Sequence, residues 1–270
     1  MTFSIVGRSP DGTSWGVAVA SKFLAVGSAV PAAAADVGAI ATQADANVGF
    51  KPRGLELLRA GASATETLER LLADDPKAEH RQVGVVDASG TAATHTGAAC
   101  FDWAGGIADQ DVAIQGNILT GPEVVEAVKA AWDASPDLPL ARRLLAALAA
   151  GDEAGGDRRG RQSAALYVVR AGAGYGGGDD VAADLRVDDH PAPVGELERL
   201  LDLNDLYLTA SEEHEKIAVT PELAAEIADL VQRAGHPDLA AWVGAENYEM
   251  RVAEDGSWID ERILGILRGL

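Results

Sequence analysis

Short apolar segments joined by tight turns constrain the fold of this chain more than any other feature. Residues 3–8 (FSIVGR) and 15–23 (WGVAVASKF) are β-rich, and the intervening SPDGTS places Pro, Asp and Gly in an order that favours a turn. A second hairpin is predicted over residues 82–97 around ASG, and a third joins SAALYVVR to VAADLRV through GYGGGDD. Because strands joined by tight turns run antiparallel, the sequence predicts antiparallel sheets rather than a doubly wound parallel sheet.

Helical spacing of apolar residues appears between these hairpins. KPRGLELLRAG is predicted to form a helix that ends at Gly61, and Ser63 with Glu66 forms a capping box for the next helix. Thr120 and Glu123 are predicted to form another capping box, and LARRLLAALAAG is predicted to end at its glycine. Further strands are expected in VGAIATQA and DVAIQGNIL.

The order of these elements predicts the fold class. It runs strands, two helices, strands, two helices, strands and one helix. Two antiparallel sheets with helices on their outer faces fit this order, so we expect an α+β fold arranged as a four-layer α/β/β/α sandwich.

The character of the sequence changes near Leu206. The polar stretch SEEHEK is followed by Thr220–Pro221, a typical helix start, and by the helical segments ELAAEIADLVQR and DERILGILR. We therefore expect a main domain over residues 1–205 and a small, mostly helical module over residues 206–270.

The charge and the cysteine content exclude several classes of function. The net charge is −20, from 22 basic and 42 acidic residues, which argues against nucleic acid and anionic membranes as partners. Arg8 and Pro10 interrupt the start where a signal peptide is apolar, and no apolar run approaches the length of about 20 residues that spans a membrane, so we expect a cytoplasmic protein. The single Cys100 cannot form an intrachain disulfide, and its apolar surroundings predict a buried structural thiol.

Several long motifs resemble a known family. They are MTFSIV, GVAVASKFLAVGSAVPAAAADVGAIATQA, EHRQVGVVDASG, QGNILTGPEVV, GGDRRGRQSAALYVV and DLRVDDHPAPVGEL. Over residues 1–205 the chain is similar to the domain-of-unknown-function family 1028. The segment WVGAENYEMRVAEDGSWIDERILGILR resembles the small module that often follows this domain and that distant analogy links to peptidoglycan binding. The resemblance implies an N-terminal nucleophile hydrolase-like fold, the αββα sandwich also found in proteasome β subunits, but a shared fold does not define an activity.

Thr2 is the residue on which the expected chemistry depends. Removal of Met1 gives Thr2 a free α-amino group beside its hydroxyl, and such a pair acts as base and nucleophile. An unperturbed α-amino group has a pKa of about 7.7–8.0, which suits a general base. The alternative is that Thr2 is only a β-branched residue at the start of a strand.

Lys22 follows the second strand and is expected to lie near Thr2. A lysine there would lower the pKa of the Thr2 amine and stabilise developing negative charge. The alternative is an ordinary lysine at a strand end, and only one of Ser21 and Lys22 can point inward.

Amide side chains gather in TQADAN and QGN. Amides and exposed backbone N–H groups at strand ends can build an oxyanion hole, and we expect Asn117 to contribute to it. The neighbouring residues expected to bind substrate are Gln43, Asn47, Gln115 and Gly116, the glycine because it permits close approach to the backbone. Alternatively, the amides satisfy loop carbonyl groups.

The segment GGDRRGRQS places Arg158, Arg159 and Arg161 in a glycine-rich loop. Because a guanidinium group matches a carboxylate, the loop is expected to hold the acid end of a substrate; the alternative is an internal network with nearby acidic residues. The family resemblance implies a further role for Asp157 or Ser163, since loop residues before the matching strand orient the N-terminal amine in proteasome-like folds.

Other clusters predict no site. Asp188, Asp189 and His190 lack the spacing of a metal site and are expected to form a helix start. The glycines of AGAGYGGG do not follow a strand and open a helix, which excludes a nucleotide-binding fingerprint. Aromatic residues of the C-terminal module are expected in its core rather than in a sugar-stacking platform: Trp242, Tyr248 and Trp258.

Two functions remain open at this point. The first is an amidase-type hydrolase that cleaves a C–N bond in a small amide or peptide-derived acid through a covalent acyl-enzyme, with no metal or organic cofactor. The second is a non-catalytic protein that holds a ligand, such as a cell-wall fragment, on the same fold, although the lack of export features argues against cell-wall work. Analogy with the fold also leads us to expect a homodimer.

Overall fold

The computed structural model describes residues 2–270 and divides into two compact units. The first unit ends at Leu201 and the second is Asp202–Leu270, so the division falls within α6 (Pro193–Tyr207), slightly before the boundary expected from the sequence. Met1, whose removal the expected chemistry requires, lies outside the described residues.

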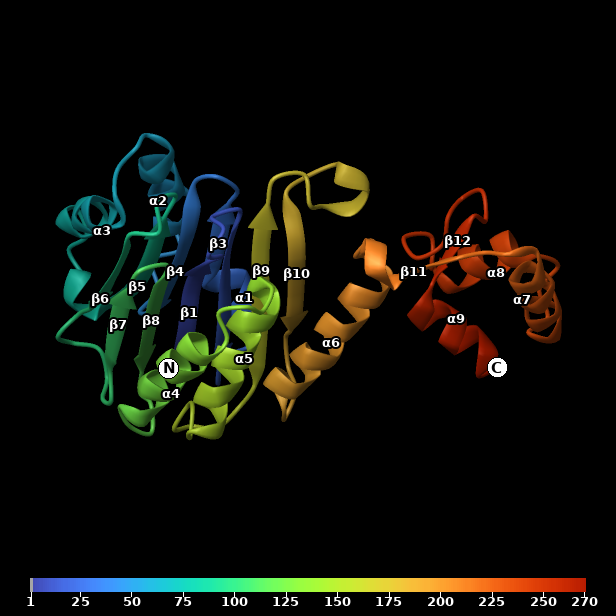
Figure 1. Ribbon diagram of the computed structural model, residues 1–270. Coiled ribbons are helices and arrows are strands. Elements are labelled where there is room, and N and C mark those ends of the chain that lie inside the picture. Colours follow the sequence, from blue (N-terminus) through green and yellow to red (C-terminus); the bar gives the residue numbers. More distant parts are fainter. Residues whose placement is uncertain (1) are drawn as a thin grey trace. The chain divides into compact units, whose positions relative to one another are not determined.

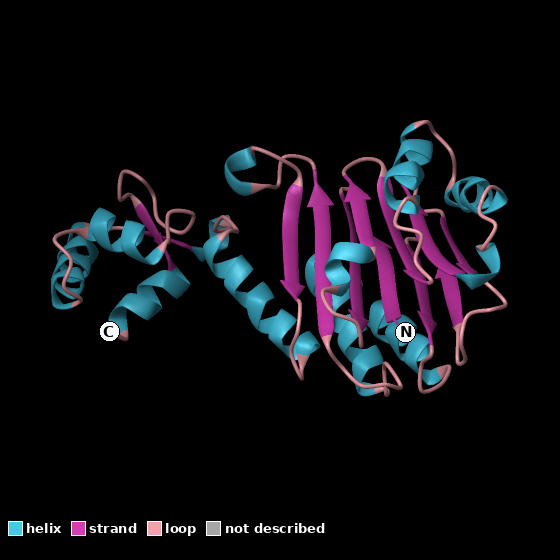
Figure 2. Ribbon diagram, turned by 180° about the vertical axis from the view of Figure 1, so that it is seen from behind, coloured by secondary structure: helices cyan, strands magenta, loops and turns pink. Residues whose placement is uncertain are grey.

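The first unit contains an antiparallel sheet of six strands in the order β10-β9-β2-β1-β8-β7. The strands of this unit are the long magenta arrows in Figure 2. In this order β1 lies between β2 and β8, so the strand that begins with Thr2 is central rather than at an edge. The predicted hairpins correspond to β1–β2, β5–β6 and β9–β10 and are confirmed. The six strands are β1 (Thr2–Arg8), β2 (Ser14–Ser21), β7 (Gly105–Asp109), β8 (Val112–Asn117), β9 (Ser163–Arg170) and β10 (Val181–Val187).

A second antiparallel sheet of four strands packs against one face of the first. The apolar part of this interface is built from small and β-branched side chains, such as Val17 and Val19 of one sheet and Ala39 and Ala41 of the other. The strands follow the order β3-β4-β5-β6 and are β3 (Pro31–Ala34), β4 (Gly38–Ala44), β5 (Arg81–Asp87) and β6 (Ala92–Thr96).

Two pairs of helices cover the outer faces of the sheets. Leu144 and Leu148 share a buried cluster with Phe3 and Ile5 of β1, so the long α5 packs directly on the six-stranded sheet. The other pair packs in the same way against the four-stranded sheet, where Leu71 contacts a cluster that contains Ile40 and Val83. The helices are α4 (Glu123–Ala134) and α5 (Leu140–Glu153) on one side, and α2 (Phe50–Arg59) and α3 (Ala64–Ala73) on the other (Figure 1). The expected α+β class with antiparallel sheets is confirmed.

The predicted helix boundaries are partly wrong. The capping box of Ser63 and Glu66 is present, but α4 has Pro122 at its N-cap and no capping side chain. Thr120 instead lies in the preceding turn, where its N–H donates to the Gly156 carbonyl over 3.2 Å. The helix predicted to stop at Gly151 continues to Glu153, and a Cβ at Gly151 would lie only 2.5 Å from a methyl group of Val128. This glycine therefore permits close helix packing instead of ending the helix.

Short elements escaped prediction. In the first unit they are α1 (Val26–Ala29), β3 and β7. The segment AVGSAVPAAAA around α1 and β3 consists almost entirely of small and apolar residues, so it shows neither helical nor strand periodicity.

The second unit has its own apolar core. Trp242 and Tyr248 are buried in it as expected, whereas Trp258 is half-buried, with the Lys216 ammonium 4.9 Å from its ring centroid. The elements after α6 are β11 (Lys216–Ala218), α7 (Pro221–Arg233), α8 (Leu239–Glu246), β12 (Trp258–Asp260) and α9 (Glu261–Arg268). Short 3-10 turns occur in both units, at Ala78–His80, Tyr175–Gly177 and Glu213–Glu215. Within residues 2–270, no helix combines the length and apolar character needed to cross a membrane.

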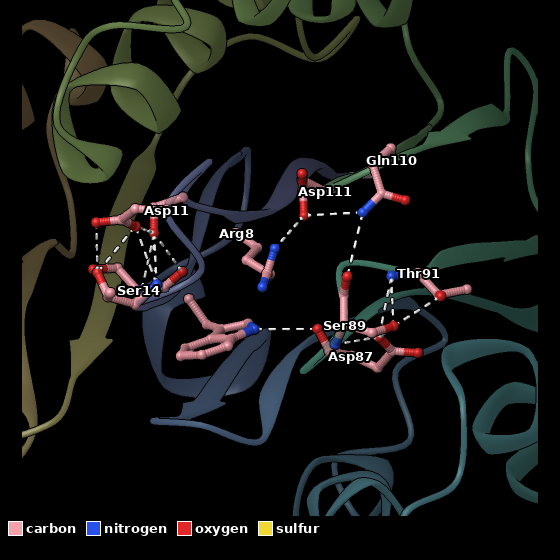
Figure 3. A network of polar contacts seen from close by, with 11 residues as sticks. Arg8, Asp11, Ser14, Asp87, Ser89, Thr91, Gln110 and Asp111 are labelled. Atoms are coloured by element: carbon pink, nitrogen blue, oxygen red, sulfur yellow. Dashed lines mark hydrogen bonds and ion pairs between the residues drawn. The ribbon is translucent and has the colours of Figure 1, made fainter.

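A polar network joins the two sheets at the end of β1 opposite Thr2 (Figure 3). The Trp15 indole N–H of β2 donates to the Asp87 carbonyl of β5 over 3.2 Å, and Gln110 donates to the Ser89 carbonyl. Arg8 forms an ion pair with Asp111 at 2.9 Å. Hydrogen bonds therefore join the two sheets at this end, and apolar side chains fill the space between them in the middle.

Candidate active site

The period of two along each strand decides which polar residues face the space between the sheets. On β1, Phe3 and Ile5 contact the helices, whereas Val6 contacts the opposite sheet, so Thr2 and Ser4 also face that sheet. Thr2 is only 6% exposed, and its register partner on β8 is Asn117. Its hydroxyl oxygen lies 3.1 Å from the hydroxyl oxygen of Ser21, at the end of β2.

The carbonyl group of Thr2 is held by two amide side chains. Gln43 donates from Nε2 over 3.1 Å and Asn117 donates from Nδ2 over 3.3 Å. Each of these nitrogens also donates to Oε1 of Gln82 over 2.9 Å. Gln82 is fully buried on β5, and by accepting from both amides it fixes their orientation. The peptide plane after Thr2 is thereby locked.

The same network continues along β1. Ser4 donates its hydroxyl to Gln43 Oε1 over 2.7 Å and accepts a hydrogen bond from Gln115 Nε2 at 2.6 Å. Gln82 Nε2 donates to the Gly116 carbonyl over 2.7 Å. We call Thr2, Ser4, Gln43, Gln82, Gln115 and Asn117 the inter-sheet amide network.

Sequence reasoning identified Gln43, Gln115 and Asn117 but missed Gln82 and Ser4. The signal was present, because Gln82 and Gly84 precede the buried Val86 at intervals of two on β5. A glutamine at an inward position of a buried strand must find partners for its amide.

Gly84→Ala is expected to damage this network. A Cβ at Gly84 would lie 2.0 Å from Oε1 of Gln115, so the methyl group would displace the amide that donates to Ser4. We expect a loss of about 1–3 kcal/mol in the free energy of unfolding, measured by urea denaturation. Gly265→Ala in α9 is the matched control, since nothing lies within 4 Å of its added Cβ. An equal loss in both variants would contradict the close approach at Gly84.

The structure places Ser21, and not Lys22, against the hydroxyl of Thr2. Ser21 is the inward member of the pair, 2% exposed, and brings its hydroxyl to Thr2. Lys22 is exposed, and its ammonium group donates to the Arg161 carbonyl over 3.2 Å. Strand β2 ends at Ser21, so Lys22 is the first residue beyond it, and its side chain reaches the glycine-rich loop. The placement does not support an electrostatic role for Lys22 at the Thr2 amine.

Asp157 and Ser163 fasten the loops beside Thr2. Asp157 is 8% exposed and accepts a hydrogen bond from the backbone N–H of Lys22 over 2.6 Å, which ties the glycine-rich loop to the end of β2. Ser163 donates to the Phe23 carbonyl over 2.5 Å and accepts from the Val26 N–H over 3.1 Å. Its hydroxyl therefore holds the loop before α1. Substrate binding by Ser163, or orientation of the Thr2 amine, stays a prediction.

The three loop arginines have different environments. Arg161 donates from Nε to both carboxylate oxygens of Asp152 over 2.8 Å, and Arg159 lies 3.3 Å from the Asp157 carboxylate. These pairs form the internal network that was the alternative for this loop, and substrate binding by Arg159 and Arg161 stays a prediction. Arg158 is exposed, and its side chain forms no ion pair with any described residue.

Asn47 and Gly116 are not brought to the hydroxyl of Thr2. Asn47 donates to Asp75 over 2.9 Å and lies at a cavity of about 520 Å³ that includes Arg53, Lys77 and Arg81. The space around Gly116 is limited by Leu119, which follows the end of β8, since an added Cβ would lie 2.4 Å from the Leu119 side chain. A contact of either residue with substrate stays a prediction.

Asp75 should make stability depend on pH in the acid range. Hydrogen bonds from Arg81 hold the pKa of the Asp75 carboxyl well below its usual range. Because the pKa is lower in the folded state, the carboxylate stabilises the fold above the unfolded pKa of about 3.9, and this stabilisation is lost as the pH falls through the folded pKa. Asp75→Asn is expected to flatten the acid limb of a plot of unfolding free energy against pH, whereas Asp74→Asn, with an exposed carboxylate, should leave it steep. Equal slopes in both variants would contradict this assignment.

The remaining sequence expectations concern metals and Cys100. Among residues 2–270 there is no group of three or more His, Cys, Asp or Glu side chains that could hold a metal ion. The ring of His190 accepts a hydrogen bond from the Ala192 N–H at the turn before α6. Cys100 is half-buried rather than buried, because its loop is partly exposed and its neighbour Phe101 is 75% exposed. Burial raises the pKa of the Cys100 thiol.

Comparisons with known proteins place the chain in a family. Residues 2–197 match the family of unknown function DUF1028, and the chain belongs to this family. A crystal structure of a Silicibacter pomeroyi protein of the same family is 32% identical, with a TM-score of 0.68 over 76% of this chain and 89% of that one. Anbu (ancestral beta-subunit) from Yersinia bercovieri is 14% identical, covers 74% of this chain and 96% of its own, and has a TM-score of 0.31, a likeness that defines neither fold nor function. No curated protein matches the chain.

Proposed function

We propose that cleavage of the peptide bond before Thr2 produces an N-terminal nucleophile amidohydrolase. The observation that carries this proposal is the double hydrogen bond from Gln43 and Asn117 to the Thr2 carbonyl, backed by Gln82. A threonine that only starts a strand does not need two amide side chains to hold its carbonyl group. Since the carbonyl is fixed, the directions of the amine and of the side chain at the Thr2 Cα are restricted as well.

The packing of helices and sheets supports the same class. Helices α4 and α5 lie on the six-stranded sheet, the four-stranded sheet lies on its other face, and α2 and α3 lie outside that second sheet. We propose that this is the four-layer α/β/β/α sandwich of N-terminal nucleophile hydrolases, with β1 as the central strand that carries the nucleophile.

The proposed reaction uses both functional groups of Thr2. The α-amine takes the proton of the hydroxyl as Oγ1 attacks the carbonyl carbon of the substrate amide. The C–N bond breaks when the tetrahedral intermediate collapses, and the ammonium group returns the proton to the departing amine. Water, deprotonated by the same α-amine, then attacks the acyl ester, and breakage of the ester C–O bond releases the acid and restores the Thr2 hydroxyl.

Residues around Thr2 take revised roles in this proposal. Asn117 donates to the Thr2 carbonyl and to Gln82, so it is a positioning residue rather than an oxyanion donor. Ser21 replaces Lys22 as the group beside the nucleophile, since its hydroxyl is 3.1 Å away and can pass or receive a hydrogen bond as the proton moves.

The substrate is proposed to be a small amide or peptide-derived acid. Arg158 supplies the recognition of its carboxylate, because the charges of Arg159 and Arg161 are already paired. The backbone N–H of Arg158 donates to the Ile118 carbonyl, one residue beyond the partner of Thr2, which keeps this loop at the same edge of the sheet.

A panel of acyl-amino acids, linear amides and short peptides tests the proposal. Released amine is measured for two preparations whose intact masses show the bond before Thr2 cleaved or uncleaved. Hydrolysis by the cleaved form alone supports the proposal, because only that form has the α-amine. Equal turnover by the uncleaved form would refute it.

A further inference from the structure

A cavity of about 270 Å³ lies beside β3, an edge strand of the four-stranded sheet. Its wall is made by residues of small volume, which contribute no charge: Gly27, Ser28, Pro31, Ala32 and Ala33. The rest of its lining is polar and comes from α2, β9 and β10, and consists of Lys51, Tyr167, Asp184 and Arg186. We call this space the basic cavity. It contains none of the residues of the inter-sheet amide network.

The lining carries an excess of positive charge. Arg186 donates from Nε to Asp184 Oδ1 over 2.8 Å and from Nη2 to Oδ2 over 3.0 Å, so this carboxylate holds the guanidinium group in place. Lys51 is half-buried and donates to the Ser28 carbonyl over 2.9 Å. Two cations therefore face one carboxylate in a chain whose net charge is −20.

Several hydrogen-bond donors of the cavity remain available. The ammonium group of Lys51 has three N–H donors and uses one of them on Ser28, and the guanidinium of Arg186 has five and uses two on Asp184. No described residue forms a hydrogen bond with the Tyr167 hydroxyl. Burial raises the pKa of this hydroxyl, and the charges of Asp184 and Asp179 raise it further, so it stays protonated and able to donate.

The Lys51 ammonium is held in unfavourable surroundings. Burial lowers its pKa, and the nearby positive charge of Arg186 lowers it further. A bound anion would relieve both effects, because it would replace lost hydration with direct hydrogen bonds and screen the two cations from one another.

We propose that the basic cavity binds a small oxyanion, a carboxylate or a phosphate, through Lys51, Arg186 and Tyr167. Arg186, oriented by Asp184, offers planar donors that match two oxygens, and Lys51 adds a point charge. The small residues of the opposite wall leave room for a ligand of few atoms. This site is independent of the function proposed for Thr2, since it stands on different residues.

Titration of the full chain with sodium phosphate and, separately, with sodium succinate tests this proposal at constant ionic strength. We expect at least one of these anions to bind saturably with Kd of about 1 mM or tighter, measured from NMR shifts of the backbone amides of α1 and β3. The two arms distinguish phosphate from carboxylate. The pKa of the Lys51 ammonium should rise when the site is saturated.

Three variants make the result specific. Lys51→Gln should weaken binding about tenfold or more, and Tyr167→Phe, which keeps the ring, should weaken it several-fold. Lys77→Gln removes the same charge at an exposed position outside the basic cavity and should leave the affinity unchanged. The proposal is overturned if neither anion binds saturably, or if the Lys51→Gln and Lys77→Gln proteins bind as tightly as each other.

Discussion

Thr2→Ala should lower the hydrolytic rate by at least about 10³-fold, because it removes the attacking oxygen while leaving the α-amine in place. Thr2→Ser keeps a hydroxyl at the same carbon and should retain a measurable part of the rate. The comparison uses cleaved protein in each case and whichever amide of the panel the unchanged protein hydrolyses fastest.

The fold should survive this substitution. The Thr2 hydroxyl contacts the Ser21 hydroxyl, and the loss of one such hydrogen bond costs about 1 kcal/mol. The hydrogen bonds from Gln43 and Asn117 to the Thr2 carbonyl involve only the backbone of residue 2, so they stay intact. Ser21→Ala is the matched control, since it removes the partner hydroxyl but not the nucleophile and should reduce the rate far less. A Thr2→Ala protein that hydrolyses amides at the unchanged rate would refute the assigned nucleophile.

Gln82→Leu should lower the free energy of unfolding by about 3–5 kcal/mol. The leucine has a similar volume but accepts no hydrogen bond, so the amide nitrogens of Gln43 and Asn117 each lose a partner. The Gly116 carbonyl also loses the donor that lies 2.7 Å away. Because all of these groups are buried, water cannot replace the lost bonds without opening the sheets.

Urea denaturation of Gln82→Leu measures this effect against a surface control. Gln110→Leu makes the same chemical change at an exposed turn, where the amide donates to the Ser89 carbonyl, and should cost less than about 1 kcal/mol. If the two variants lose equal stability, the network around Gln82 does not hold the sheets together. If Gln82→Leu folds, it should also lower the hydrolytic rate, since Gln43 and Asn117 would be free to turn away from Thr2.

The sheets and most helices could be predicted because their signals are local. Short β-rich segments and the turn sequences SPDGTS, ASG and GYGGGDD lie next to each other in the chain, and they defined the hairpins that were found. Thr120 shows the limit of such signals. Its spacing to Glu123 matches a capping box, but a backbone hydrogen bond to Gly156, more than thirty residues away, holds it outside the helix.

The candidate site was predicted in composition but not in geometry. Gln43 and Asn117 could be named because amides at strand ends are unusual. Their shared partner Gln82 was missed: its inward position on β5 has a local signal, but nothing local shows that three separate strands converge between the sheets. Which of Ser21 and Lys22 lies against the Thr2 hydroxyl depends on the direction of the last residue of β2, and the chemistry of the side chains alone does not show that direction. The sequence also did not show which carboxylates pair with Arg159 and Arg161, because this depends on how the loop folds.

Covalent trapping with a β-lactone tests the central claim most directly. Attack by the Thr2 oxygen opens the lactone ring and leaves an acyl ester on the protein, which is located by digestion and tandem mass spectrometry. The account predicts one adduct, on the side chain of a peptide that starts at Thr2 with an unmodified α-amine, and none on the Thr2→Ala protein. An adduct on another side chain, or labelling of Thr2 at the same rate while Met1 is still attached, would contradict it.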